Sequence, residues 1–147
     1  DAVLVINADL VSEIDVNALV LDHARTGADL TIATHAETHR LEFGEVEADA
    51  SGRVTAYVEK PLKSWRLSSG TYVIGARSKN LVRRGERLDL PDLVRRAIDA
   101  GHFVHEHRHS ALWIDVNDES SRRAAEEALA KSPGTVLARA NTPESTS

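Results

Sequence analysis

Residues 2–9 have the sequence Ala2-Val3-Leu4-Val5-Ile6-Asn7-Ala8-Asp9, an apolar run rich in β-branched side chains that ends in polar residues. Such a run suits a central strand covered on both faces, as in the parallel sheets of α/β proteins. Apolar residues then recur at helical spacing from 14 to 25, with Asp15 placed to cap the helix and Gly27 to end it. Residues 30–34 predict a second strand. This strand–helix–strand order indicates a βαβ unit with a right-handed crossover, and therefore an α/β fold.

The middle of the chain predicts a β-hairpin. Residues 43–48 and 53–58 alternate in polarity as strands do, and Asp49-Ala50-Ser51-Gly52 between them suits the turn. Further strands are predicted at 69–74, from 103 and at 112–116, and helices at 90–100 and 119–130. Residues 132–147 are rich in Pro, Gly, Thr and Ser, a composition typical of disorder. We therefore expect a folded part over residues 1–131 and a disordered tail.

Composition narrows the classes of function. The 147 residues suffice for one domain with a hydrophobic core, and the 41% hydrophobic and 28% charged content is ordinary for such a domain. A net charge of -5 argues against a nucleic-acid partner, because phosphate backbones bind basic surfaces. No apolar run approaches the roughly 20 residues of a membrane span, so no membrane partner is expected. The absence of cysteine excludes disulfides and thiol chemistry and fits a cytoplasmic location.

Two aspartates, far apart in the sequence, end apolar strands. Asp9 follows the first strand, and Asp115 lies within Trp113-Ile114-Asp115-Val116. Ligands of open α/β sheets bind outside the carboxyl ends of the strands, which is where a catalytic carboxylate is expected. Two converging carboxylates can hold Mg²⁺, which prefers oxygen ligands together with water and phosphate. The alternative is that each aspartate simply caps a helix or ends a strand.

Five segments, in order, resemble the sugar-1-phosphate nucleotidyltransferases (nucleoside-diphosphate-sugar pyrophosphorylases). The first strand with Asn7-Ala8-Asp9 is similar to their strand ending in Asn-Gly-Asp. Phe43-Gly44-Glu45-Val46-Glu47 with Gly52-Arg53-Val54 matches their sugar-site hairpin, and Val58-Glu59-Lys60-Pro61 matches their Glu-Lys-Pro motif. Ser68-Ser69-Gly70-Thr71-Tyr72-Val73 matches their Gly-x-Tyr strand. Trp113-Ile114-Asp115-Val116 matches their late Trp-x-Asp motif. Together the matches cover roughly residues 1–127.

The resemblance implies both a fold and a reaction. The fold is part of a Rossmann-like, mixed-sheet nucleotidyltransferase domain of the GT-A-like kind, with an inserted β-hairpin region that binds the sugar. Residues 1–131 would be the C-terminal part of that domain. The reaction transfers a nucleotidyl group from a nucleoside triphosphate to a sugar 1-phosphate, giving an NDP-sugar and pyrophosphate. In such chemistry the protein mainly positions the reactants and neutralises phosphate charge.

Three residues match the catalytic positions of that family. Asp9 and Asp115 match the two carboxylates that bind the metal, so Mg²⁺ is the implied cofactor. Lys60 matches the lysine that contacts the sugar phosphate, where a compact ammonium acts as a point charge. The alternative for Lys60 is a solvated side chain at a strand end with no role in binding.

Further residues match the family's sugar site. Glu59 matches the carboxylate that accepts hydrogen bonds from sugar hydroxyls, and Gly44 the glycine where the backbone approaches the sugar. Ser69 and Gly70 fall in the matched strand that follows, and we count them as substrate-binding. The alternatives are a β-bulge at Gly44 and simple close packing at Gly70.

The chain also departs from the family pattern. Ala8 replaces the usual glycine before the first aspartate, and no Gly-rich phosphate loop occurs in the 147 residues, so the site for the nucleoside triphosphate is largely missing. A sheet lacking neighbouring strands exposes an edge that invites pairing. We therefore expect a homo-oligomer or a complementing N-terminal segment. The alternative function is a non-catalytic relict of the fold that binds sugar phosphates or another subunit.

Three histidines alternate within one predicted strand. His105, His107 and His109 are two residues apart, so their side chains can share a face and could bind Zn²⁺ or Ni²⁺. The intervening Glu106 and Arg108 are also polar, which favours an edge strand near solvent over a metal site.

Overall fold

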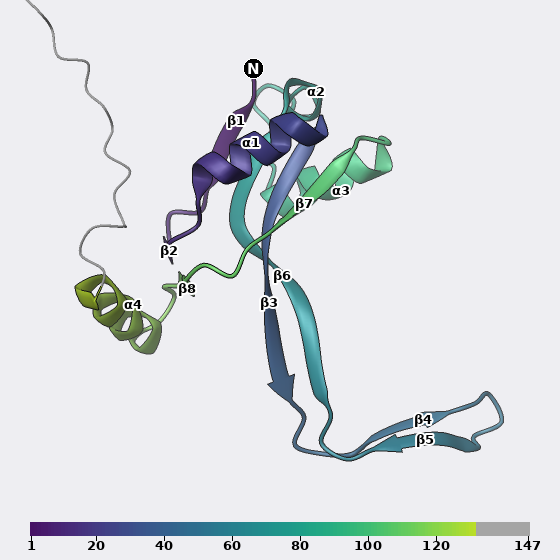
Figure 1. The fold of residues 1–147 in the computed structure, drawn as a ribbon. Helices are drawn as coiled ribbons and strands as arrows, with labels where there is room; N and C mark the ends of the chain where they lie inside the picture. The colour runs from purple at the N-terminus through teal and green to yellow at the C-terminus, as the bar shows by residue number, and fades with distance from the viewer. Residues whose placement is uncertain (132–147) are drawn as a thin grey trace, which may run out of the picture.

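The computed structural model describes residues 1–131, in which a four-stranded mixed sheet has helices on both faces (Figure 1). The strand order is β1-β6-β3-β7. These strands are β1 (Val3–Ile6), β6 (Leu62–Ile74), β3 (Leu30–Arg40) and β7 (Val104–Arg108). β6 runs antiparallel to both β1 and β3, whereas β3 and β7 are parallel. The sheet is therefore mixed, as the family resemblance implies.

The first apolar run lies at one edge of this sheet. β1 pairs with β6 alone among the described residues, and Val3, Leu4 and Ile6 are 40–49% exposed. Only Val5 packs against the core. The expectation of a central strand covered on both faces in a parallel sheet is therefore wrong for residues 1–131. Hydrophobic patterning reports how apolar a strand is, but not how many neighbours it finds.

The predicted βαβ unit is present, with one strand between its two parallel strands. β1 and β3 are both antiparallel to β6, and α1 (Val16–Thr26) connects them. The Asp15 carboxylate accepts a hydrogen bond from the Ala18 amide at 2.9 Å, and Gly27 ends the helix in the left-handed conformation at φ 67°. Both helix boundaries follow from local chemistry, because capping satisfies backbone groups that the helix leaves free.

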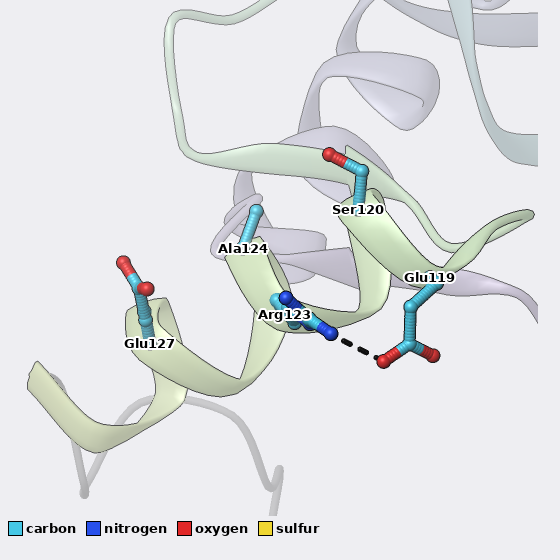
Figure 2. A pocket seen from close by; sticks show the side chains of 5 residues that line it. All are labelled: Glu119, Ser120, Arg123, Ala124 and Glu127. Carbon is cyan, nitrogen blue, oxygen red and sulfur yellow. Dashed lines mark hydrogen bonds and ion pairs between the residues drawn. The ribbon is translucent and has the colours of Figure 1, made fainter.

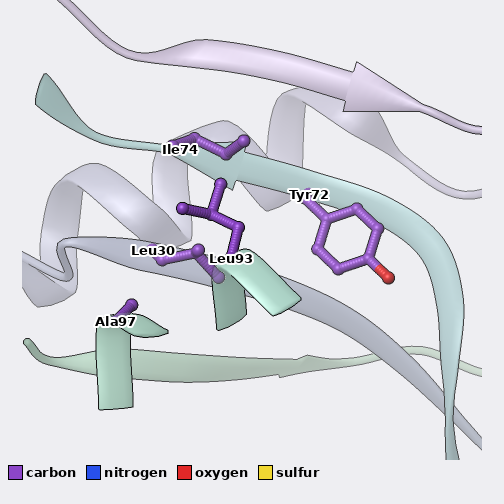
Figure 3. Packing of buried hydrophobic residues seen from close by; sticks show 5 residues of the cluster. All are labelled: Leu30, Tyr72, Ile74, Leu93 and Ala97. Carbon is purple, nitrogen blue, oxygen red and sulfur yellow. The ribbon is translucent and has the colours of Figure 1, made fainter. Parts of the chain in front are cut away.

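Helices cover the two faces of the sheet. On one face, Leu19 of α1 packs against Ala33 and Val73. On the other face lies α3 (Leu90–Asp99), the helix predicted at 90–100, and Figure 3 shows its Leu93 and Ala97 over the sheet. The sheet residues in this second cluster are Leu30, Tyr72 and Ile74. The alternation of faces along β6 follows from the two-residue period of a strand. The short α2 (Ala76–Lys79) follows β6 and was not predicted.

A long two-stranded ribbon leaves the sheet (Figure 1). β3 and β6 stay paired as far as Arg40 and Leu62, well beyond the strands predicted at 30–34 and 69–74. The predicted hairpin follows, as β4 (Glu45–Ala48) paired with β5 (Val54–Val58). The outer half of β3 is mostly polar, and the apolar residues of outer β6, Leu62, Trp65 and Leu67, are exposed, so these halves are held mainly by pairing with each other. We call residues 36–67 the arm.

The remaining elements form a small second sheet and a helix beside it. β2 (Leu10–Ser12) pairs antiparallel with β8 (Trp113–Asp115), and α4 (Glu119–Lys131) follows β8. The strand predicted at 112–116 and the helix predicted at 119–130 are confirmed; β2 was not predicted. Within the described residues no helix is both long and apolar enough to cross a membrane. The disordered tail predicted for 132–147 lies outside the described residues.

Candidate functional site

The pairing of β2 with β8 makes the backbones of the two predicted metal-binding aspartates neighbours. Leu10 is the register partner of Asp115, and the Val116 amide donates to the Asp9 carbonyl oxygen at 2.8 Å. Asp9 and Asp115 are therefore neighbours across two strands that lie about one hundred residues apart in the chain. The Asp9 residue is exposed and Asp115 is half-buried.

The carboxylate of Asp115 has an unpaired oxygen. Its Oδ1 is buried and finds no hydrogen-bond partner within residues 1–131, and Oδ2 is 3.5 Å from the Asn117 amide nitrogen, a long contact. A buried, unpaired charged oxygen is costly, and a cation would relieve that cost. The described part of the chain holds no cluster of three or more His, Cys, Asp or Glu side chains arranged for a metal. A divalent ion here would use the two carboxylates with water or phosphate oxygens, as Mg²⁺ commonly does.

Ser69 lies beside this strand pair, with its hydroxyl used inside the protein. The residue is 1% exposed, and its Oγ lies 2.9 Å from His35 Nδ1 and 2.6 Å from His109 Nε2. The Trp113 indole N–H donates to the Ser69 carbonyl at 2.9 Å, and its ring stacks on His35 with centroids 4.3 Å apart. The predicted contact between Ser69 and substrate stays a prediction, and the buried hydroxyl is not presented to solvent.

Gly70 lets the end of β1 approach β6. Its φ is 67°, and a Cβ built there would lie 2.8 Å from Leu10 Cδ1 and 2.9 Å from Asn7 Nδ2. The Asn7 amide donates to the Gly70 carbonyl at 2.9 Å. Close packing, the alternative role for Gly70, is thus what the geometry supports, and a direct substrate contact stays a prediction.

The predicted sugar-binding residues gather at the base of the hairpin. A Cβ on Gly44 would overlap the Tyr57 ring, and the Tyr57 hydroxyl donates to Glu59 Oε2 at 2.7 Å. That bond to the Glu59 carboxylate raises the pKa of Tyr57. Lys60 is exposed and adopts φ 46°, which is uncommon for a residue other than glycine, and Arg40 donates to its carbonyl at 3.1 Å. Such backbone outliers are enriched at functional sites.

The structure separates the residues at the base of the hairpin from the two aspartates. Lys60 precedes the first residue of β6, whereas Gly70 lies deep within the strand, beside the end of β1. At roughly 3.3 Å per residue, about 25 Å of extended strand separates Leu62 from Gly70. Figure 1 shows the hairpin pointing away from β2 and β8. Asp9 and Asp115 are therefore together, while Gly44, Glu59 and Lys60 form a second group at the far end of the ribbon.

The three alternating histidines divide between two sites. His105 Nε2 and His107 Nδ1 each lie 2.9 Å from Asp22 Oδ2 on α1, whereas His109 contacts Ser69. The bonds from His107, Arg25 and His105 hold the pKa of Asp22 far below its usual range. β7 is indeed an edge strand within residues 1–131, but its two histidines are half-buried and paired with α1.

Two surface hollows lie along α4. Figure 2 shows one of them, where Arg123 lies 3.2 Å from Glu119, an exposed pair that contributes little to stability. Its lining residues are Glu119, Ser120, Arg123, Ala124 and Glu127. The other lies between α4 and the β2–β8 pair and includes Leu112 and Ile114. Neither hollow contains a predicted catalytic residue.

Sequence reasoning missed His35, His109 and Trp113 as neighbours of the site. Trp113 carried a signal, because it belongs to the matched motif that contains Asp115. The two histidines carried none, since they meet Ser69 from positions 34 and 40 residues away in the chain.

The described residues thus combine a mixed α/β sheet with a separate strand pair, β2–β8, at which Asp9 and Asp115 lie. The sequence model of the family described as Nucleotidyl transferase matches residues 1–132, and the chain belongs to that family. It is similar to the glucose-1-phosphate adenylyltransferase of Paraburkholderia phytofirmans, with 39% identity over 62 residues, 40% of this chain and 14% of the relative. The corresponding enzyme of a Jannaschia species is 30% identical over 63 residues, 42% of this chain and 15% of the relative. The chain thus spans a small part of these relatives.

Solved structures support the same fold. A Bacillus anthracis protein assigned as a glucose-1-phosphate thymidylyltransferase superposes with a TM-score of 0.63 at 19% identity, covering 90% of this chain and 55% of that one. HddC from Yersinia pseudotuberculosis gives a TM-score of 0.57 at 21% identity, with coverages of 87% and 55%. This chain therefore corresponds to about half of each neighbour, and the predicted α/β nucleotidyltransferase fold is confirmed.

Proposed function

We propose that this chain supplies the metal-binding and sugar-phosphate sites of a sugar-1-phosphate nucleotidyltransferase. The reaction joins a sugar 1-phosphate to the nucleotidyl group of a nucleoside triphosphate and releases pyrophosphate. The observation that carries the proposal is the adjacency of the Asp9 and Asp115 backbones on the β2–β8 pair, with Asp115 Oδ1 buried and unpaired within residues 1–131, in a chain of this family.

The residues at this strand pair suit Mg²⁺. Asp9 and Asp115 supply hard oxygen ligands from adjacent strands, and Asp115 Oδ1 has no competing hydrogen bond from the described residues. The ion, when bound, would neutralise negative charge on the phosphates. The amide of Val116, which donates to the Asp9 carbonyl, holds the backbones that carry the two carboxylates side by side.

Lys60 and Glu59 are proposed as the ligands of the sugar 1-phosphate. The Lys60 ammonium is exposed and can approach a phosphate, while Glu59 retains acceptor capacity beyond its bond from Tyr57. Because about 25 Å of extended strand separates Leu62, next to this group, from Gly70, beside the end of β1, transfer requires the arm to approach the aspartates, or the arm of another copy to supply Lys60.

The separation of the two groups also favours a second candidate, a module that binds sugar phosphate without turnover. Release of pyrophosphate from a nucleoside triphosphate and a sugar 1-phosphate distinguishes the two candidates. Pyrophosphate released by the 147-residue chain would exclude the module, because binding without turnover releases none.

Calorimetric titration with glucose 1-phosphate and with mannose 1-phosphate tests the sugar site. Removal of a charged hydrogen-bond donor with Lys60→Ala should weaken binding at least tenfold, since such bonds contribute about 1.5–3 kcal/mol. Lys79→Ala, an exposed lysine on α2, is the matched control and should leave the affinity unchanged. Equal affinities for the wild type and Lys60→Ala would refute the assignment.

A further inference from the structure

We infer that Ser69, held between His35 and His109, is a positioning residue that locks the strand of Asp115 against the strand of Asp9. The inference concerns the geometry of the strand pair, and its consequence for metal binding rests on the function proposed above. Ser69 is 1% exposed, so its hydroxyl acts through other residues of the protein rather than on a ligand.

The proton arrangement around Ser69 is directional. A serine hydroxyl has one proton, so it donates to one imidazole and accepts from the other. His35 Nε2 lies 3.5 Å from Glu37 Oε1, too long for a strong hydrogen bond but close enough for the carboxylate to favour a proton on Nε2. His35 Nδ1 then accepts from the Ser69 hydroxyl, and His109 Nε2–H donates to Ser69 Oγ. The distances of 2.9 Å and 2.6 Å fit either order, so the direction rests on the Glu37 contact, since His35 Nε2 is buried and has no hydrogen-bond partner among the described residues.

Burial favours the neutral form of His109. Desolvation is the main cause that lowers the pKa of His109, and the nearby His35 and His107 lower it further. With its one proton on Nε2, His109 has a bare Nδ1, which is buried and finds no partner among the described residues.

The Ser69–Gly70 backbone joins the strands that carry the two aspartates. The Ser69 carbonyl accepts from the indole of Trp113, which lies two residues before Asp115 and therefore on the same face of β8. The Gly70 carbonyl accepts from the amide of Asn7, two residues before Asp9. Loss of the hydroxyl would leave both imidazoles unpaired and free the segment that makes these two contacts.

The test compares Ser69→Ala with variants of one of its partners. His109→Gln keeps an N–H donor within reach of Ser69, whereas His109→Leu removes it. Ser78→Ala is the matched control, because Ser78 is also fully buried and also bonded to a histidine, His102, at 2.9 Å, but lies on α2.

Three measurements on the 147-residue chain report the effects of these substitutions. Hydrogen exchange at the Val116 amide reports the β2–β8 register, the Trp113 indole resonance reports its bond to Ser69, and electron paramagnetic resonance reports Mn²⁺ affinity. Ser69→Ala and His109→Leu should accelerate Val116 exchange and weaken Mn²⁺ binding, each about tenfold, the effect of one lost buried hydrogen bond. His109→Gln should remain near the wild type, a rescue that mere loss of packing would not show. The indole of Trp65, on the arm, should not shift.

The inference is overturned if Ser69→Ala leaves Val116 exchange and the Trp113 indole as in the wild type. It is equally overturned if Ser78→Ala produces the same local changes. A wild-type chain that binds no Mn²⁺ would refute the proposed metal site alone, because the Val116 and Trp113 measurements still decide the role of Ser69.

Discussion

Replacing Gly70 by alanine should destabilise the fold far more than an ordinary glycine substitution. Gly70 has φ 67°, and a side chain in this left-handed region costs roughly 1–2 kcal/mol. The new Cβ would also lie 2.8 Å from Leu10 Cδ1 and 2.9 Å from Asn7 Nδ2, and overpacking of this kind typically costs about 1–3 kcal/mol. The expected loss is therefore about 2–5 kcal/mol, from a total that for most domains is about 5–15 kcal/mol.

Gly101→Ala separates the two contributions. Gly101 has almost the same φ, 69°, but a Cβ there would meet nothing within 4 Å, so only the conformational cost of about 1–2 kcal/mol applies. Urea unfolding followed by circular dichroism measures both variants. With a slope of about 1–3 kcal/mol per molar urea, the midpoint of Gly70→Ala should lie about 1 M below that of Gly101→Ala. Equal midpoints would show that the side chains of Leu10 and Asn7 move away from a new Cβ at little cost.

Two other predictions concern pH and association. Burial lowers the pKa of both His23 and His109 in the folded chain, so as the pH falls below about 6.5 the unfolded chain takes up protons first. The urea midpoint should therefore be constant above pH 7 and fall between pH 6.5 and 5, less steeply in His109→Gln; a midpoint that rises on acidification would contradict this. The exposed outer edge of β1 should pair with another chain, so sedimentation should show association that rises with concentration and weakens in Leu4→Lys, where Leu4 is 40% exposed. The control Leu21→Lys, 69% exposed on α1, should associate as the wild type does, and a monomer at all concentrations would refute the prediction.

The motifs predicted the family and one half of the candidate site. The order of the Asn7-Ala8-Asp9, Glu59-Lys60-Pro61 and Trp113-Ile114-Asp115 segments indicated a nucleotidyltransferase, and the family match confirms it. Asp9 and Asp115 were expected to lie near one another from their positions at strand ends, and their backbones are neighbours on the β2–β8 pair. The place of Lys60 at the end of a long ribbon was not expected, because outer β3 is mostly polar and the apolar residues of outer β6, Leu62, Trp65 and Leu67, do not alternate regularly. The metal-binding and sugar-binding roles themselves stay predictions.

What the sequence determined by itself is local. Asp15 begins α1 and Gly27 ends it, and the Asp49 carboxylate closes the hairpin turn by accepting a hydrogen bond from the Ser51 amide at 2.8 Å. Each of these bonds joins residues within a few positions of one another, so the local sequence is enough to predict it. The tertiary structure decided what depends on distant partners: β1 at an edge of the described sheet, and Ser69 between His35 and His109. Such contacts depend on residues distant in the sequence, which the local sequence pattern does not identify. The same physical reason explains why the two aspartates could be found in the sequence, but the residues that hold their strands together could not.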